Sequence, residues 1–220
     1  MHQKTIWVLI IVILLAGGWY FMSRKTVEAP NDIATTTRQG SVGTLTDGVY
    51  ALDVEKSSLT WTGSKTLIKE YFDNGTLSFK EGSVIVTGGT LVAGSFVVDM
   101  KSFKTISTSN QKVPGSALET HLKSADFFDV ATYPIATVGI KSVENGIVKA
   151  DVTIKNVTKE VSFPATISQD GKTLSGTASL TLDRTLWDIR YGSGKFFSDL
   201  GDKVISDSVK IDLTLVAQSN

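Results

Sequence analysis

Alternation of apolar and polar residues in the second half of the chain is the feature that most constrains its fold. From Val161 to Ile167 every second residue is apolar, and every second residue from Leu174 to Leu182 is apolar or glycine. A period of two places successive side chains on opposite faces of a strand, so each segment predicts a strand with one dry and one wet face. This arrangement is typical of antiparallel sheets.

The rest of the region 47–220 carries the same signature. Val, Ile and Thr together make up 64 of the 220 residues, and such branched side chains favour strands over helices. Turn residues such as Gly88-Gly89 and Asn145-Gly146 separate the candidate strands. About nine strands are predicted, which fits a sandwich or a barrel, and periodicity does not separate the two. The predicted strands are Val49–Val54, Ser58–Ser64, Ser83–Thr87, Thr90–Met100, Pro134–Ser142, Ile147–Ile154, Val161–Ile167, Leu174–Leu182 and Lys203–Ala217.

One short helix is predicted to interrupt the strands. Pro114-Gly115 is followed by Ser116-Ala117-Leu118-Glu119, which has the spacing of a capping box. Leu118 and Leu122 lie one turn apart on a common face. We expect this helix to close one end of the β structure.

The N-terminal region predicts membrane targeting. Residues 6–22 form a run of 17 without a charge, and a helix of this length spans roughly 25 Å, near the lower limit for a membrane span. We therefore predict a cytoplasmic stub over 1–5, a transmembrane anchor over 6–22, a flexible linker over 23–46 and an exported β domain over 47–220. A cleaved signal peptide is the alternative for 6–22, because Ala16-Gly17-Gly18 resembles a signal peptidase site.

Composition excludes several classes of function. Lys and Arg number 22, and Asp and Glu also number 22, so the basic surface of a nucleic-acid-binding protein is not expected. The chain has no cysteine, which excludes disulfides, thiolate nucleophiles and cysteine-based metal sites.

The histidine pattern argues against an enzyme. His121 is the single histidine of the predicted β domain. A base at His121, supported by Asp126 or Asp129 and paired with Ser116 or Ser124, is the catalytic alternative. The chain has neither a G-x-S-x-G nor an H-E-x-x-H motif, so we predict no catalytic residue and no metal site.

A glycine-containing loop at 192–195 precedes two adjacent aromatic residues. The loop lacks the spacing of a phosphate-binding loop and is expected to connect strands. Phe196 and Phe197 are large and apolar, so we expect them to plug the core or to gate a cavity.

Residues 121–134 (HLKSADFFDVATYP) resemble the hallmark of the YceI-like family, the lipid- or polyisoprenoid-binding β-barrels of bacteria. Two more segments are similar to the family pattern in the right order: Val152–Lys159 to its LTIKGVTK strand pair, and Asp183–Ile189 to its arginine-containing turn. Gly48–Asp53 resembles the first strand. The resemblance covers essentially all of 47–220.

The chain departs from the family pattern at several positions. Asn156 and Asp188 stand where the family has glycine, and both residue types tolerate a left-handed backbone, so the turns should survive. Lys56-Ser57 replaces a His-Ser pair, which leaves any role of that histidine in doubt here. The loop 191–206 looks longer than in the shortest relatives.

The resemblance implies an all-β fold, an extended antiparallel lipocalin-like barrel, to which the residues themselves add one short helix and a preceding N-terminal transmembrane helix. With the predicted anchor at 6–22, we expect a membrane-tethered exported protein of the bacterial cell envelope, anchored once in the inner membrane with the barrel on the periplasmic or extracellular side. The resemblance further implies a lipid-like partner held in the lumen, such as an isoprenoid quinone or a fatty acid or amide, with no catalytic cofactor and no nucleic acid. A homodimer is left open. The alternative is a filled barrel that binds another envelope protein.

The residues predicted to line the lumen are the large apolar side chains of the dry strand faces and of nearby turns. They are Leu59, Trp61, Phe79, Phe96, Val98, Val138, Ile140, Phe163, Leu180, Leu182, Trp187, Phe196, Ile211 and Leu213.

Overall fold

The computed structural model describes residues 40–109 and 113–219, all of which lie in one compact unit, 32–220. Within these residues the strands are antiparallel except for one short parallel pair. The elements are β1 (Ser41–Val42), β2 (Gly48–Leu52), β3 (Ser58–Ser64), β4 (Phe72–Thr87), β5 (Thr90–Thr108), α2 (Gly115–Lys123), β6 (Ile135–Glu144), β7 (Ile147–Ile154), β8 (Val157–Asp170), β9 (Thr173–Asp183), the 3₁₀ turns η1 (Arg184–Trp187) and η2 (Gly201–Lys203), and β10 (Ser208–Ser219).

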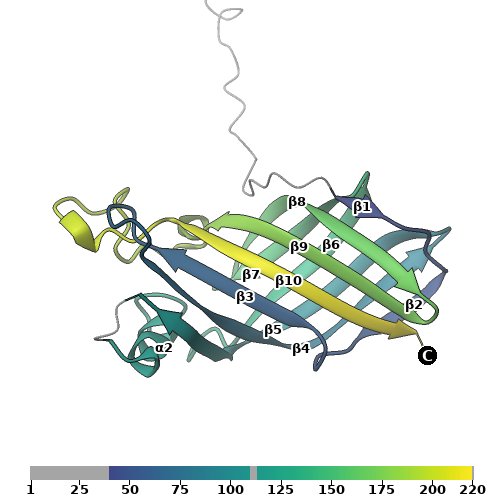
Figure 1. Ribbon diagram of the computed structural model, residues 1–220, viewed down its shortest axis with the longest axis horizontal. Helices are drawn as coiled ribbons and strands as arrows, with labels where there is room; N and C mark the ends of the chain where they lie inside the picture. The colour runs from purple at the N-terminus through teal and green to yellow at the C-terminus, as the bar shows by residue number, and fades with distance from the viewer. Residues whose placement is uncertain (1–39, 110–112, 220) are drawn as a thin grey trace, which may run out of the picture. The chain divides into compact units, whose positions relative to one another are not determined.

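The strands close into a barrel with eight positions (Figure 1). Strands β4 to β10 follow one another around the ring, and β10 pairs with β9 along nearly its whole length. β2 and β3 share the position between β4 and β10, because each pairs with both of these strands at a different height. The prediction of an all-β antiparallel barrel with one short helix is confirmed for the described residues.

The predicted strand boundaries are confirmed for two strands, whereas β8 (Val157–Asp170) extends beyond the regular run Val161–Ile167 at both ends. β3 and β7 begin and end at the predicted residues. The prediction for β4 was wrong in length, since the strand begins at Phe72 and not at Ser83. Register shifts after Asn74, Thr76 and Phe79 interrupt its pairing with β5, although Gly75, Leu77 and Phe79 are buried in regular alternation. β10 begins at Ser208 rather than Lys203.

The two ends of the barrel differ. At the end that we call the open end lie α2, the β3–β4 loop and the long segment 184–207, which Figure 1 shows together on one side with the C-terminus on the other. At the opposite end, which we call the far end, residues 43–46 lead from β1, which pairs with β8, across to β2. Leu45, Tyr50 and Val86 are buried there, and the Tyr50 hydroxyl donates a hydrogen bond to the carbonyl of Thr46 at 2.8 Å. These side chains close the far end.

Part of the predicted linker therefore belongs to the barrel. β1 pairs in parallel with Thr166 and Ile167 of β8, and the amide of Gly43 donates to the carbonyl of Ile167 at 2.8 Å. The rest of the predicted linker, the predicted anchor at 6–22 and the stub lie outside the described residues. Within the part of the chain that the structure describes, no helix has the length and hydropathy of a membrane span.

Helix α2 packs against the open end as expected, but its capping box is not formed. The helix begins two residues earlier than the box requires, with Pro114 at the N-cap and no side-chain cap. Glu119 instead accepts a hydrogen bond from the backbone amide of Thr105 at 2.8 Å, and the Thr105 hydroxyl donates to the Gly115 carbonyl at 3.2 Å. These two contacts fasten the helix to β5.

The barrel has its own core. The buried apolar side chains of residues 40–109 and 113–219 form one hydrophobic cluster inside the closed sheet. A closed barrel with its own core folds independently, so the fragment 32–220 is suitable for experiments.

Candidate functional site

The barrel interior contains two cavities that lie end to end. The larger, which we call the outer chamber, has a volume of about 320 Å³ and reaches the open end. The smaller, the inner chamber, has a volume of about 100 Å³ and lies toward the far end among residues of β2, β4, β5 and β9. Both are lined almost entirely by apolar side chains, so a ligand held there must present apolar surface.

The structure places thirteen of the fourteen predicted lining residues against these chambers. They divide according to their height in the barrel. Trp61, Leu180, Leu182, Trp187 and Ile211 line the outer chamber, Phe79, Phe96 and Ile140 line the inner chamber, and Leu59, Val98, Val138, Phe163 and Leu213 line both. Whether they bind a ligand is a prediction.

Phe196 is the predicted lining residue that the structure does not place against either chamber. It lies on the loop between η1 and η2, is 45% exposed and lines neither chamber. The Arg190 guanidinium lies 4.6 Å from the centre of its ring, which gives this aromatic side chain a partner outside the core. Phe197 is 50% exposed, so neither ring plugs the core.

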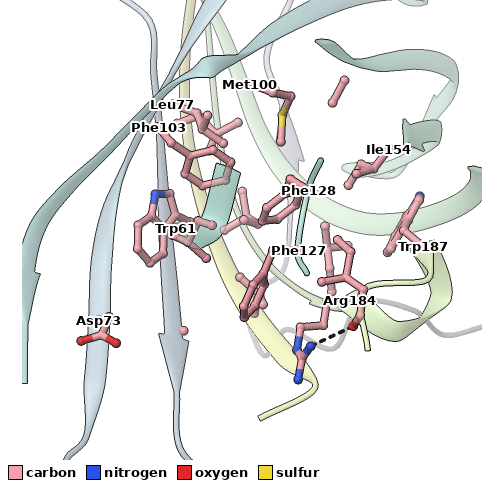
Figure 2. A pocket seen from close by; sticks show the side chains of 18 of the residues that line it. Trp61, Asp73, Leu77, Met100, Phe103, Phe127, Phe128, Ile154, Arg184 and Trp187 are labelled. Carbon is pink, nitrogen blue, oxygen red and sulfur yellow. Dashed lines mark hydrogen bonds between the residues drawn. The ribbon is translucent and has the colours of Figure 1, made fainter. Parts of the chain in front are cut away.

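An aromatic wall lines one side of the outer chamber. The rings of Trp61 and Phe103 meet edge to face at 6.0 Å, and Phe103 lies 4.9 Å from Phe128. Figure 2 shows these three side chains next to one another, with Trp187 across from them. Phe103 was not among the predicted lining residues, because it lies three residues beyond Met100 and this spacing breaks the period of two.

Polar groups of the outer chamber gather at the open end. Lys65 and Tyr71 flank the β3–β4 loop, and the Lys65 ammonium lies 5.0 Å from the centre of the Tyr71 ring. Burial, and then the negative charge of Asp73, raises the pKa of Tyr71. A ligand with an apolar chain and a polar head would therefore place its head here.

Arg184 is buried at the rim and ties the long segment 184–207 together (Figure 2). Its Nη1 donates to the carbonyl of Ile189 at 2.8 Å, and its Nε to the carbonyl of Ser206 at 3.0 Å. Its Nη2 contacts the Ile205 carbonyl at 3.3 Å and the Asp207 carboxylate at 3.4 Å. Since most of its donors serve the protein itself, Arg184 holds the rim and is not a free anion site.

Trp187 fills the space at the place where strands β8 and β9 separate. Pairing of β8 with β9 covers only Ala165–Asp170 and Thr173–Ala178, and nearer the open end η1 lies against β8. There the Trp187 indole is 1% exposed and its Nε1 donates to the carbonyl of Val152 at 3.1 Å. The turn that carries Trp187 ends at Asp188 with a φ of 59°, as expected for a residue that replaces glycine.

His121 does not form a catalytic arrangement. Its Nε2 lies 3.3 Å from the carboxylate of Asp126, as the catalytic alternative required. The hydroxyl of Ser124, however, donates to the backbone carbonyl of His121 at 2.8 Å and not to its ring. The imidazole packs against Phe127 and Tyr191 at 5.0 and 4.7 Å, which joins α2 to the loop after η1. Within 40–109 and 113–219 no cluster of acidic or histidine side chains could hold a metal ion.

Asp183 fastens the start of η1. Its Oδ1 accepts hydrogen bonds from the amide and hydroxyl of Thr185 at 3.0 and 2.6 Å, and its Oδ2 lies 2.7 Å from the Lys195 ammonium. Burial alone would raise the pKa of Asp183, but the contacts with Lys195 and Thr185 outweigh it and hold the pKa below its ordinary value.

Acid is therefore expected to loosen the open end. Because the folded-state pKa of Asp183 is lowered, its contribution to stability is present above the ordinary value of 3.8 and is lost as the pH falls through the folded-state pKa. We expect the fragment 32–220 to melt at a higher temperature than its Asp183→Asn variant at neutral pH, with the difference shrinking below pH 3.8. Melting curves at several pH values test this, and a difference that stays constant into acid would contradict it.

A family model for the YceI-like domain matches residues 50–217. The chain belongs to the YceI-like family. The resemblance of the hallmark segment is thereby confirmed. YceI-like proteins are binding barrels and not known enzymes, in agreement with the prediction that the chain has no chemistry of its own.

Curated relatives and solved structures agree with this assignment. A UPF0312 protein of Pseudomonas putida (strain W619) is 28% identical over 156 residues, which cover 69% of this chain and 77% of the relative. The crystal structure of BcnA from Burkholderia cenocepacia aligns with a TM-score of 0.59 at 23% identity, covering 76% of this chain and 99% of that one. A polyisoprenoid binding domain from Saccharophagus degradans, implicated in plant cell wall breakdown, aligns with a TM-score of 0.56 at 18% identity, covering 78% and 98%.

Proposed function

We propose that this YceI-like protein is a membrane-tethered, exported carrier that holds an amphiphilic isoprenoid or fatty molecule in its lumen. The observation that carries the proposal is the outer chamber, an apolar space of about 320 Å³ that reaches one end of the barrel and has its polar residues only there. The volume lies at the lower end of the range typical of small-molecule sites. The polyisoprenoid-binding domain of Saccharophagus degradans, a structural neighbour, supports the class of ligand.

Apolar side chains exposed around the open end support exchange of the ligand with a bilayer. Leu67 and Phe72 at the β3–β4 loop are 66% and 46% exposed, and Ile106 near the end of β5 is 67% exposed. Phe196 and Phe197 add two exposed rings from the segment 184–207. Grouped exposed apolar residues mark interaction surfaces, and a lipid surface suits a rim that surrounds an apolar lumen. The uncharged run at 6–22 is the proposed anchor that keeps the barrel near that surface.

Mass spectrometry of the natural protein tests the proposal. The full chain is extracted from its native membranes, and the purified protein is then extracted with organic solvent. We expect an apolar molecule with a polar head at close to one per chain. Recovery without any such molecule, together with failure of the fragment 32–220 to take up a fluorescent prenyl probe, would overturn the carrier proposal in favour of the filled barrel that binds an envelope protein.

A further inference from the structure

We propose that the lumen selects its ligand by chain length, with a ring of five side chains as the limit. In this proposal, which rests on the proposed function, an apolar chain of roughly a dozen carbon atoms fills the outer chamber. Longer chains meet the ring, whose largest member is Phe163, and do not enter the inner chamber. The substrate class is then a medium-chain amphiphile with its head at the open end.

The ring is the set of residues that line both chambers, and we call it the waist: Leu59, Val98, Val138, Phe163 and Leu213. These residues come from five strands, β3, β5, β6, β8 and β10, so they surround the lumen at one height. Leu59 and Leu213 are direct cross-strand partners. Val98 and Phe163 are only 4% and 8% exposed, so the barrel encloses both side chains at this height.

The sizes of the chambers set the limit. A cavity of about 150 Å³ admits benzene, which has six carbon atoms, so the outer chamber of about 320 Å³ takes roughly twice as many. The inner chamber of about 100 Å³ would add roughly four more. If the waist were open, both chambers together would hold a chain of about three isoprene units. A chain of five or more such units would leave its remainder outside.

The inner chamber offers a position at which it can be filled without strain. Gly176 of β9 lines it, and a Cβ atom added there would meet only the Cβ of Leu215, at 3.9 Å. A valine at this position suits a strand and would occupy the inner chamber while leaving the outer chamber unchanged. Removal of the Phe163 ring is expected to enlarge the available space instead, because the two chambers then join.

Two natural reporters make the test direct. In the fragment 32–220 the only tryptophans are Trp61 and Trp187, and both line the outer chamber. Their fluorescence is followed while saturated fatty acids with chains of 8 to about 18 carbons are added below their micelle concentrations. We expect the affinity to rise by about fourfold for each added methylene up to about 12 carbons and then to level off. A rise that continues without a break to the longest chain would overturn the inference.

We call the chain length at which the affinity levels off the break, and three variants locate it. Phe163→Ala is expected to move it to longer chains by about four carbons, and adding Gly176→Val is expected to return it to its original place. Gly176→Val alone, the matched control, should leave it unchanged. If Phe163→Ala does not fold by circular dichroism, Phe163→Leu gives the same test with a smaller shift. A break that none of these changes moves would show that the waist is not the limit. If fatty acids bind without any break, only this inference fails; if no chain of any length binds, the proposed function fails as well.

Discussion

Replacing Phe163 by aspartate is expected to abolish uptake of a prenyl or fatty probe, with a loss of affinity of at least a hundredfold. Phe163 lines both chambers and is 8% exposed, and the side chains around it are apolar. A carboxylate in that environment must keep water near it or take up a proton, and either outcome removes the continuous apolar surface on which the affinity depends. Quenching of Trp61 and Trp187 by the probe measures the change.

The matched control for this variant is Ser162→Asp. Ser162 is the adjacent residue of β8, its side chain is on the other face of the strand, and it pairs with Lys149 of β7. The control introduces the same charge outside the lumen and should leave affinity within about threefold. Leu182→Asp, at a partly buried lumen position, repeats the test if Phe163→Asp does not fold. Unchanged uptake by a folded lumen variant would contradict the assignment of these residues to the ligand site.

Removing the indole of Trp187 is expected to cost about 3–5 kcal/mol of the free energy of unfolding. The side chain is 1% exposed, fills the space where β8 and β9 separate, and satisfies the carbonyl of Val152. Trp187→Ala leaves both a cavity and a carbonyl without that donor. Urea unfolding followed by circular dichroism measures the loss, because this signal does not depend on the removed fluorophore.

Two further variants separate packing from hydrogen bonding at this position. Trp187→Phe keeps most of the apolar volume and loses the N–H group, so we expect a cost of about 1–2 kcal/mol. Phe196→Ala removes an aromatic ring nearby in the sequence that is 45% exposed, and should cost less than about 1 kcal/mol. Equal losses for Trp187→Ala and Phe196→Ala would contradict the role assigned to Trp187.

Local pattern predicted the strands well and the irregular elements poorly. Alternation located β7 and β8, because the period of two is a property of the strand itself; the ends coincide for β7, whereas β8 runs from Val157 to Asp170, beyond its regular run. In β4 the segment Phe72–Gly82 was missed although Gly75, Leu77 and Phe79 are buried in alternation, because Asp73-Asn74-Gly75 consists of residue types typical of turns. The capping-box prediction was wrong because Glu119 instead accepts a hydrogen bond from the backbone amide of Thr105. Thr105 belongs to β5, and local spacing does not show that β5 lies against the helix.

The residues of the candidate site also divide into those that alternation predicted and those that it did not. Lumen residues on strands, such as Val98 and Leu180, follow from alternation, because a dry face has to point into a closed barrel. Phe196 did not follow, because a residue on a loop has no period to fix its direction, and its ring lies beside Arg190 on the outside. Phe103 was missed because a strand irregularity changed its face.

The sequence by itself determined the fold class, the family and which residues of most strands share a face, since these depend on residue type and on spacing along the chain. Only the tertiary structure decided that β2 and β3 share one position of the ring, that residues 43–46 close the far end and that the lumen has two chambers. The physical reason is that a period of two fixes the side to which a residue points, whereas the height at which it meets residues of other strands is set by hydrogen-bond register. The waist exists because side chains from five strands, far apart in the sequence, arrive at the same height.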